Sequence, residues 1–320
     1  MMNNAIQRRI ADLEQYRPEL TAEPDLDAFW GETLNAAKDK PLNGTRLLTK
    51  TPLDSMEAYK VEYEGFDSTR IHGWFILPKN RPADAKLPCV VLYHGYTGSK
   101  GYPEDFAQYA MLGVAAFAVD IRGQGGDTGN LLAQRHGMTR GWLTQNILDK
   151  EECYYKAISI DALKALEWAA AQPEVDAGRI CASGGSQGGG LALLAAALSE
   201  VPSIAVAHIP NMCHMDFGIL NSTSSLTEAA DFLNRFPEKL DEVLRTLSYF
   251  DMMNLAHRIR IPLLVSVGLK DPVTMPETIF AAYNRIESDK RIEIYPFQGH
   301  AVSGDQNRKA LEFIRSRFNF

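Results

Sequence analysis

Short apolar runs that alternate with helical segments constrain the fold of this chain more than any other feature. The apolar runs are PCVVLYHG (88–95), GVAAFAVDIRG (113–123), RICASGG (179–185), SIAVAHIP (203–210) and IPLLVSVG (261–268). Segments with helical spacing separate several of them, such as 102–113, 155–173 and 186–199. Apolar strands joined through helices are typical of a parallel sheet with helices on both faces. The sequence therefore predicts the α/β class with a mostly parallel sheet.

Three regions lie outside this alternation and are predicted to add a strand pair, an N-terminal helical segment and a helical insertion to the sheet. Residues 56–66 and 69–78 alternate apolar and polar residues, which predicts an antiparallel pair of edge strands. Residues 1–40 are expected to form an N-terminal helical extension that packs on the main body through one face: Leu26, Phe29, Trp30, Leu34 and Ala37. Residues 211–250 interrupt the alternation and are expected to form a helical insertion, either a cap or an oligomer contact. Since no linker or repeat divides the chain, we expect residues 1–320 to form one domain.

Composition and charge exclude several classes of partner. The formal net charge is −7 and no block of five basic residues occurs, so we expect no nucleic-acid partner. No apolar run reaches 18 residues, so we expect no membrane partner. The N-terminal residues lack the apolar core of a secretory signal, and the 4 cysteines are scattered without CxxC spacing. These features predict a cytoplasmic protein.

The stretch CASGGSQGGG (181–190) follows a predicted strand and opens a predicted helix. No lysine follows as a phosphate-binding Walker loop requires, and Leu193 stands where a dinucleotide loop needs its third glycine. The stretch does match GxSxG, from Gly184 to Gly188, which forms a sharp turn that exposes a serine nucleophile. The alternative is that Ser186 only caps the helix. If Ser186 is the nucleophile, Gly184 and Gly188 make room for the turn, and Gly189 and Gly190 let the helix lie close to the sheet.

A serine nucleophile needs a base and an acid that orients the base. Asp271 follows the apolar run IPLLVSVG, and His300 follows RIEIYPFQG (291–299), in the acid-then-histidine order of this type of site. Each could separately be an ordinary loop residue, but their joint placement predicts a triad of Ser186, His300 and Asp271. Asp120 is the second candidate for the acid.

Backbone amides of Tyr96 and Gln187 are the candidates for stabilising the oxyanion. Tyr96 lies in the loop after the 88–95 run, where Gly95 is expected to allow the necessary bend. His94 is expected to be a structural hydrogen-bonding residue. Asp120 and Arg122 could join two loops through a charge-assisted bond or lie on the surface. Cys213 and His214 lack spaced partners, so no metal is assigned and no cofactor is expected.

Several motifs together resemble the acetyl xylan esterase and cephalosporin C deacetylase family of carbohydrate esterases. They are YHGY (93–96), RGQ (122–124), HG with GW and ILDK (136–150), GGSQGGG (184–190), TLSYFDMMNLA (246–256), GLKDPVTMPETIFAAYN (268–284) and GH (299–300). The resemblance implies an α/β-hydrolase fold, the triad Ser186, His300 and Asp271, and oxyanion donors at Tyr96 and Gln187. It also implies deacetylation of small acetylated substrates, without a cofactor, by an intracellular hexamer.

Two alternatives to an acetyl esterase stay open at this point. A serine peptidase or longer-chain carboxylesterase could use the same fold, because a fold does not fix its substrate. A hydrolase-like binding protein without activity is the other. Residues 208–218, HIPNMCHMDFG, contain fewer aromatic residues than the resemblance leads us to expect. The part of the substrate pocket that would bind the sugar, and therefore the natural substrate, is not determined by the resemblance.

Overall fold

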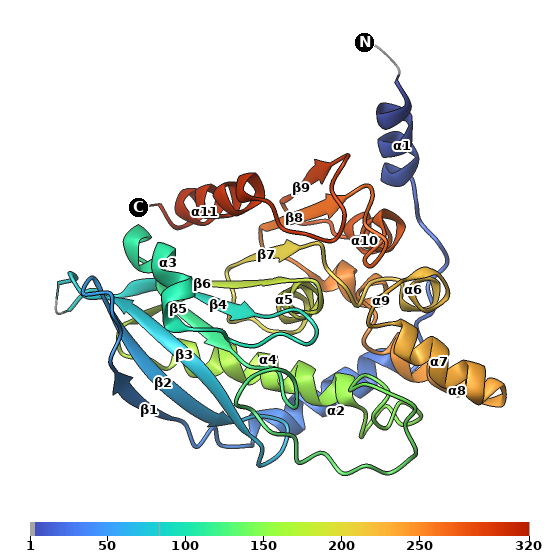
Figure 1. Ribbon diagram of the computed structural model, residues 1–320, viewed down its shortest axis with the longest axis horizontal. Coiled ribbons are helices and arrows are strands. Elements are labelled where there is room, and N and C mark those ends of the chain that lie inside the picture. The colour runs from blue at the N-terminus through green and yellow to red at the C-terminus, as the bar shows by residue number, and fades with distance from the viewer. Residues whose placement is uncertain (1–3, 83, 320) are drawn as a thin grey trace.

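A computed structural model describes residues 4–82 and 84–319. Within them, nine strands form one sheet in the order β1-β2-β3-β5-β4-β6-β7-β8-β9 (Figure 1). The pairs β1–β2, β2–β3 and β3–β5 are antiparallel. The pairs β5–β4, β4–β6, β6–β7, β7–β8 and β8–β9 are parallel. The strands are β1 (Thr45–Thr49), β2 (Met56–Glu64), β3 (Arg70–Pro78), β4 (Leu87–Tyr93), β5 (Ala115–Val119), β6 (Val175–Gly185), β7 (Ile204–His208), β8 (Leu263–Gly268) and β9 (Lys290–Tyr295). The predicted α/β class with a mostly parallel sheet is confirmed.

Helices cover both faces of this sheet. They are α1 (Ala5–Glu14), α2 (Leu26–Lys38), α3 (Ala107–Leu112), α4 (Tyr154–Ala170), α5 (Gln187–Leu198), α6 (Met215–Asn221), α7 (Thr227–Arg235), α8 (Leu240–Ser248), α9 (Met252–Leu255), α10 (Pro276–Tyr283) and α11 (Gly304–Phe318). Short 3-10 turns occur at Pro103–Phe106, Pro237–Lys239 and Ala256–Arg258. No helix in the described residues is both long and apolar enough to cross a membrane.

Two apolar cores lie on opposite faces of the sheet. One packs α3 and α11 against strand residues such as Val90 and Val206. The other packs α4 and α5, with the N-terminal and inserted helices, against residues such as Val91 and Ala207. Successive side chains of a strand point to opposite faces, so a run such as Val90-Val91 serves both cores. This explains why the central strands are continuously apolar in the sequence.

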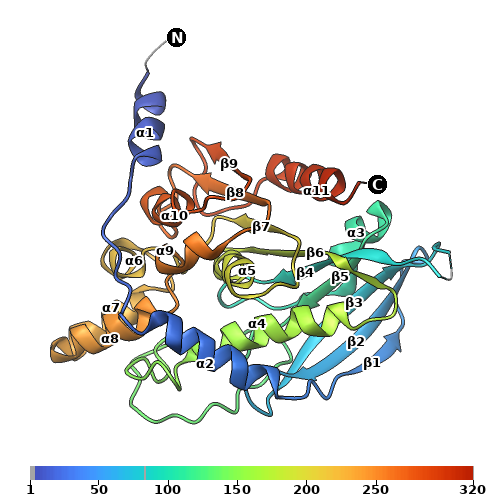
Figure 2. The same cartoon turned by 180° about the vertical axis from the view of Figure 1, so that it is seen from behind.

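The N-terminal extension packs on the main body as expected. Figure 2 shows α2 beside α4, and α1 at one end of the molecule near α10. Trp30 is fully buried, packs edge-on against Phe250, and donates its indole N–H to the carbonyl of Tyr249 at 2.8 Å. Of the predicted face of α2, only Leu34 is left partly exposed, and Thr33 is buried instead.

Two details of the predicted strands are wrong. The β2–β3 pair exists, but neither strand is at the edge, because β1 covers β2 and β3 pairs with β5. No sequence pattern predicted β1, TRLLT, whose burial pattern does not alternate and whose Leu47 and Leu48 are exposed. The expected helix at 102–113 is a 3-10 turn followed by the six-residue α3.

Candidate active site

The five predicted site residues lie at the carboxyl edge of the parallel strands. Tyr96 follows β4, Ser186 follows β6, Asp271 follows β8 and His300 follows β9, while Gln187 opens α5. Carboxyl ends of parallel strands meet at one edge of a sheet, and ligands of open α/β sheets bind there. The helices of the insertion, α6, α7 and α8, lie beyond the same edge (Figure 1).

The turn at Ser186 is strained, and its neighbouring glycines relieve the crowding. Ser186 has φ 55° and ψ −118°, a conformation that serine rarely adopts. A Cβ on Gly188 would lie 2.0 Å from the carbonyl oxygen of Tyr93, and a Cβ on Gly184 would lie 2.3 Å from that of Gly188. No side chain fits at either position without moving the backbone. The roles predicted for these two glycines are therefore confirmed.

Ser186 starts α5 without capping it through its side chain. Its hydroxyl instead lies 3.0 Å from Nε2 of His300, so the helix-cap alternative is wrong. Gly189 and Gly190 do allow a close approach, but mainly to the loop after β7 rather than to the sheet face. A Cβ on Gly189 would lie 2.8 Å from the His208 carbonyl, and one on Gly190 would lie 2.5 Å from the Asn211 carbonyl.

Ser186, His300 and Asp271 form one hydrogen-bonded chain. Nδ1 of His300 lies 2.8 Å from Oδ2 of Asp271. A carboxylate only accepts hydrogen bonds, so Nδ1 carries the proton and Nε2 presents its lone pair to the Ser186 hydroxyl. Asp271 is 3% exposed, and its other oxygen accepts the amides of Val273 at 2.8 Å and Thr274 at 3.0 Å. This arrangement can remove a proton from the Ser186 hydroxyl.

The loop after β4 lies beside Ser186. A Cβ on Gly95 would lie 3.6 Å from the Cβ of Ser186, which places the following Tyr96 amide near the serine. In the described part of the chain, neither the Tyr96 amide nor the Gln187 amide donates a hydrogen bond to another group. Both N–H groups remain free to bind a ligand oxygen.

The bend of this loop is not at Gly95 as predicted. Thr97 takes the left-handed conformation, with φ 67°, whereas Gly95 has no positive φ and only ordinary contacts. A positive φ is costly for a β-branched residue, so other contacts must hold Thr97 in place.

Gln124 provides one of these contacts and was not recognised as a site residue from its sequence. Its Oε1 accepts the Thr97 amide at 2.9 Å, and its Nε2 donates to Oε1 of Gln187 at 3.1 Å and to the Tyr154 hydroxyl at 2.9 Å. The side chain is 7% exposed. One buried amide therefore joins the loop after β4 to the residue that follows Ser186. The RGQ motif (122–124) includes Gln124 and supported the family resemblance, but it does not predict the contacts that Gln124 makes.

The side chain of Tyr96 connects this loop to the helical insertion. Its hydroxyl donates to the carboxylate of Glu228 on α7 and accepts the amides of Trp142 at 2.9 Å and Leu143 at 3.2 Å. Burial is the main cause that raises the pKa of Tyr96, and the hydrogen bond to Glu228 is the second. Burial also raises the pKa of Glu228. The insertion thus contacts Tyr96, in the loop beside Ser186.

Asp120 and Arg122 are buried, and each makes charge-assisted bonds to another segment of the chain rather than lying on the surface. Asp120 accepts the Lys100 amide at 2.7 Å and the Lys100 ammonium at 3.0 Å. Arg122 is fully buried and binds both carboxylate oxygens of Asp161, at 2.6 and 2.8 Å. Asp120 makes no contact with His300, so Asp271 takes the acid position in the hydrogen-bonded chain.

His94 has the structural role expected of it. Its Nε2 accepts the amide of Ile121 at 2.8 Å, so Nδ1 carries a proton and donates to the Gly95 carbonyl at 2.7 Å. Burial lowers the pKa of His94, which favours this neutral form. Cys213 and His214 lie in the loop before α6, and no group of three His, Cys, Asp or Glu side chains suited to a metal occurs in residues 4–82 and 84–319.

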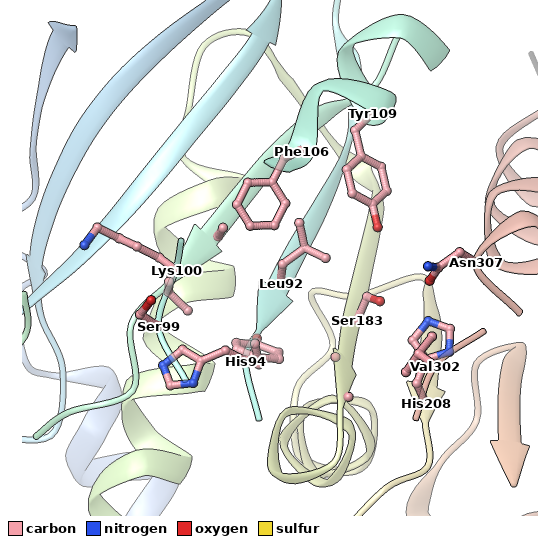
Figure 3. Close-up of a pocket in the computed structure, with 15 residues that line it drawn as sticks. Leu92, His94, Ser99, Lys100, Phe106, Tyr109, Ser183, His208, Val302 and Asn307 are labelled. Atoms are coloured by element: carbon pink, nitrogen blue, oxygen red, sulfur yellow. The ribbon is translucent and has the colours of Figure 1, made fainter. Parts of the chain in front are cut away.

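A cavity of about 300 Å³ lies next to the nucleophile turn, on the sheet face covered by α3 and α11 (Figure 3). Gly184 and Gly185 line it, but Ser186 and His300 do not. Figure 3 shows the hydroxyl of Ser183 and the ring of His208 at this cavity, with Tyr109 above them. Burial lowers the pKa of His208 to about 4. The cavity is thus a neighbour of the triad rather than its substrate cleft.

Comparisons with solved structures give close matches over almost the whole chain. The acetyl xylan esterase from Paenibacillus sp. R4 is 40% identical with a TM-score of 0.93, covering 96% of this chain and 99% of that one. Acetyl xylan esterase 1 from Thermoanaerobacterium sp. JW/SL YS485 is 29% identical with a TM-score of 0.90, covering 97% of this chain and 99% of that one. The Pyrococcus furiosus esterase Pf2001, at 20% identity and a TM-score of 0.57 over 86% of this chain and 99% of that one, shares the fold. The fold is that of the α/β-hydrolases.

Sequence comparisons agree with the structural ones. The acetyl esterase Axe7A of Xylanibacter ruminicola is 25% identical over 312 residues, which are 95% of this chain and 69% of the relative. Residues 4–317 match the family described as acetyl xylan esterase (AXE1). The chain is therefore a carboxylic ester hydrolase that belongs to the acetyl xylan esterase family.

Proposed function

We propose that this chain is a serine esterase that removes acetyl groups from small acetylated carbohydrates. Acetylated xylo-oligosaccharides are the proposed substrates, and cephalosporin C, implied by the family resemblance, is a further one. The observation that carries the proposal is the hydrogen-bonded chain from Ser186 through His300 to Asp271, at 3.0 and 2.8 Å. The family and its relatives, which are acetyl and acetyl xylan esterases, support the acetyl group and the carbohydrate.

In the proposed reaction, Nε2 of His300 takes the hydroxyl proton of Ser186 as Oγ attacks the acetyl carbonyl carbon. The carbonyl oxygen becomes an oxyanion, which accepts hydrogen bonds from the Tyr96 and Gln187 amides. Asp271 holds His300 in orientation and stabilises its positive charge. His300 then gives the proton to the departing sugar oxygen, and the ester bond breaks to leave an acetyl-serine.

The second half of the reaction uses the same groups. His300 takes a proton from a water molecule whose oxygen attacks the acetyl-serine carbonyl. The second oxyanion binds the same two amides and collapses, which releases acetic acid and returns the proton from His300 to Oγ of Ser186; the acid then ionises to acetate in solution. An acyl site fitted to two carbons leaves no room for further methylenes, so acetyl esters should react faster than butyrate esters.

The test compares turnover of nitrophenyl acetate and nitrophenyl butyrate by the wild type, Ser186→Ala and Ser199→Ala. We expect Ser186→Ala to lose at least roughly 10⁴-fold in turnover, with no labelling by a fluorophosphonate, because the attacking oxygen is gone. Ser199, at the end of α5, is the control and should retain full activity. Undiminished turnover in Ser186→Ala would overturn the mechanism, and a preference for butyrate would overturn the acetyl specificity.

The natural substrate is tested by acetate release from acetylated xylan, xylo-oligosaccharides and cephalosporin C. Release from the oligosaccharides supports the proposed substrate class. Cleavage of a peptide or long-chain ester panel without acetate release would instead support the peptidase or carboxylesterase alternative. Absence of both turnover and serine labelling would support a non-catalytic binding protein.

A cytoplasmic hexamer is the proposed state of the protein. The hexamer rests on the family resemblance and is tested by light scattering of the purified chain. The cytoplasmic location is supported by Cys89, Cys153, Cys181 and Cys213, which are all buried and unpaired. Cell fractionation tests it.

A further inference from the structure

Thr274 places a buried hydroxyl against the acid of the triad. Its Oγ1 lies 2.9 Å from Oδ2 of Asp271, the same oxygen that faces His300. It also lies 3.1 Å from the carbonyl of Ile209 and 3.3 Å from Nδ1 of His300. Thr274 is 2% exposed, so water does not replace these contacts. The hydroxyl therefore contacts two of the three members of the chain that ends at Ser186.

The hydroxyl hydrogen of Thr274 has two acceptors within reach. Neither the Asp271 carboxylate nor the Ile209 carbonyl can donate, so the threonine supplies the only hydrogen for both contacts. The carboxylate is nearer and charged, and charge-assisted hydrogen bonds are the stronger kind. We assign the hydrogen mainly to Oδ2 of Asp271, with a secondary contact to the carbonyl of Ile209.

The second contact joins Asp271 to a strained segment. Ile209 has φ 39°, a rare conformation for a β-branched residue, and begins the loop after β7. Its amide donates to the Ser266 carbonyl at 3.1 Å, and the next loop residue but one, Asn211, donates its amide to the Ser186 carbonyl at 2.9 Å. The Thr274 hydroxyl thus lies between the acid and a loop that contacts the nucleophile.

We propose that Thr274 is a positioning residue that orients Asp271 and limits the negative charge that this carboxylate presents to His300. This inference rests on the proposed function. His300 must be neutral to accept the Ser186 proton, and a carboxylate that shares its charge with a hydroxyl favours the protonated imidazole less. Removal of the Thr274 hydroxyl should therefore make Asp271 a stronger acceptor for the protonated imidazole.

Among residues 4–82 and 84–319, Asp271 is the charged side chain that hydrogen-bonds to His300. In the described chain, the contacts of its ring nitrogens are Asp271 from the loop after β8, Thr274 from the same loop, and Ser186 from the nucleophile turn. Lys270, beside Asp271 in the chain, directs its ammonium to the Phe297 ring at 5.6 Å. The electrostatic interaction of His300 with its surroundings is therefore set mainly by Asp271 and by the groups that donate hydrogen bonds to Asp271.

The test is the pH profile of kcat/KM for nitrophenyl acetate in Thr274→Val, Thr274→Ser and Thr278→Val. In Thr274→Val, we expect the acid limb to move up by about half a pH unit and plateau kcat to fall roughly tenfold, with little change in KM. Thr274→Ser retains the hydroxyl and should restore most of both. Thr278 is a matched control because it is 3% exposed and its hydroxyl donates to the Met275 carbonyl at 2.8 Å, without touching the triad.

Fluorophosphonate titration of active sites corrects each variant for its folded fraction. An unmoved acid limb in Thr274→Val would overturn the proposal, as would equal losses in the valine and serine variants, which would indicate that the methyl group matters instead. The same shift in Thr278→Val would also overturn it, because the effect would then be general. Loss of the proposed function is seen separately, as activity that survives Ser186→Ala.

Discussion

The turn at Ser186 and the loop after β4 meet at the same site, but they are built differently. Backbone geometry shapes the turn, where Gly184 and Gly188 leave no space for a Cβ. Side chains from distant segments hold the loop, since Gln124 binds Thr97 and Glu228 binds the Tyr96 hydroxyl. Changes in the turn should therefore disrupt folding, whereas changes around the loop should reduce activity and leave the fold intact.

The largest effect is expected for Gly188→Ala. The new Cβ would lie 2.0 Å from the Tyr93 carbonyl oxygen, which would separate the turn from β4. We expect a loss of more than about 3 kcal/mol of unfolding free energy, measured by denaturant titration. Gly31→Ala in α2 is the control, because a Cβ there meets nothing within 4 Å and alanine favours a helix. A Gly188→Ala protein as stable as wild type would show that the backbone of the turn is not sterically fixed.

A smaller effect is expected from His208, whose carbonyl accepts the Ser186 amide at 3.0 Å. Burial lowers the pKa of His208 from its ordinary 6.5 to about 4. Between these values the unfolded chain binds a proton that the folded chain does not, so stability falls as pH decreases from 6.5 to 4. This one residue contributes a loss of roughly 3 kcal/mol at most.

The measurement is the unfolding free energy of wild type and His208→Asn at several pH values. Nε2 of Gln306 lies 2.7 Å from Nδ1 of His208. An asparagine side chain can still accept a hydrogen bond from this nitrogen, but it does not take up a proton in this pH range. The acid-induced loss should therefore be smaller in this variant. His136→Asn, at an exposed position, is the control and should follow the wild type. Identical pH curves for His208→Asn and the wild type would contradict the assignment.

The smallest of these effects is expected for Gln124→Leu, on the loop side of the comparison. Leucine fills the space but cannot accept the Thr97 amide or bind Gln187. Because the Tyr96 and Gln187 amides would be misaligned rather than lost, we expect kcat to fall about 10- to 100-fold, less than the roughly 10²- to 10³-fold loss for a removed oxyanion donor. KM should change little.

Circular dichroism and kinetics with nitrophenyl acetate check this variant. Gln172→Leu is the control, since Gln172 donates to the Trp168 carbonyl at 2.8 Å beyond the end of α4. Unfolding of Gln124→Leu would show that the loop and the turn are equally structural, which would remove the difference between them.

The sequence predicted those parts of the molecule that depend on local pattern. Continuous apolar runs predicted the parallel strands, because a strand that is buried on both faces needs apolar residues on both. Strand β1 was missed because its exposed leucines do not alternate with buried residues, and it is ordered by pairing with β2. The bend of the loop after β4 was expected at Gly95, whereas the left-handed residue is Thr97. Threonine rarely adopts this conformation without help from a distant residue such as Gln124, so no local pattern predicts it there.

Local sequence determined the parallel strands and most of the helices, because apolar periodicity acts between near neighbours in the chain. It also indicated the turn at Ser186 through its glycines, although the contact that excludes a Cβ at Gly188 is with Tyr93 on another strand. The GxSxG motif selected Ser186 as a candidate, and the positions of Asp271 and His300 after predicted strands, in that order, selected the other two. Only the tertiary structure decided their partners: Arg122 pairs with Asp161 rather than Asp120, Gln124 joins two loops, and Thr274 touches Asp271. Such polar contacts join residues far apart in the chain or depend on exact side-chain direction. Their geometry exists only once the sheet has brought its carboxyl ends together.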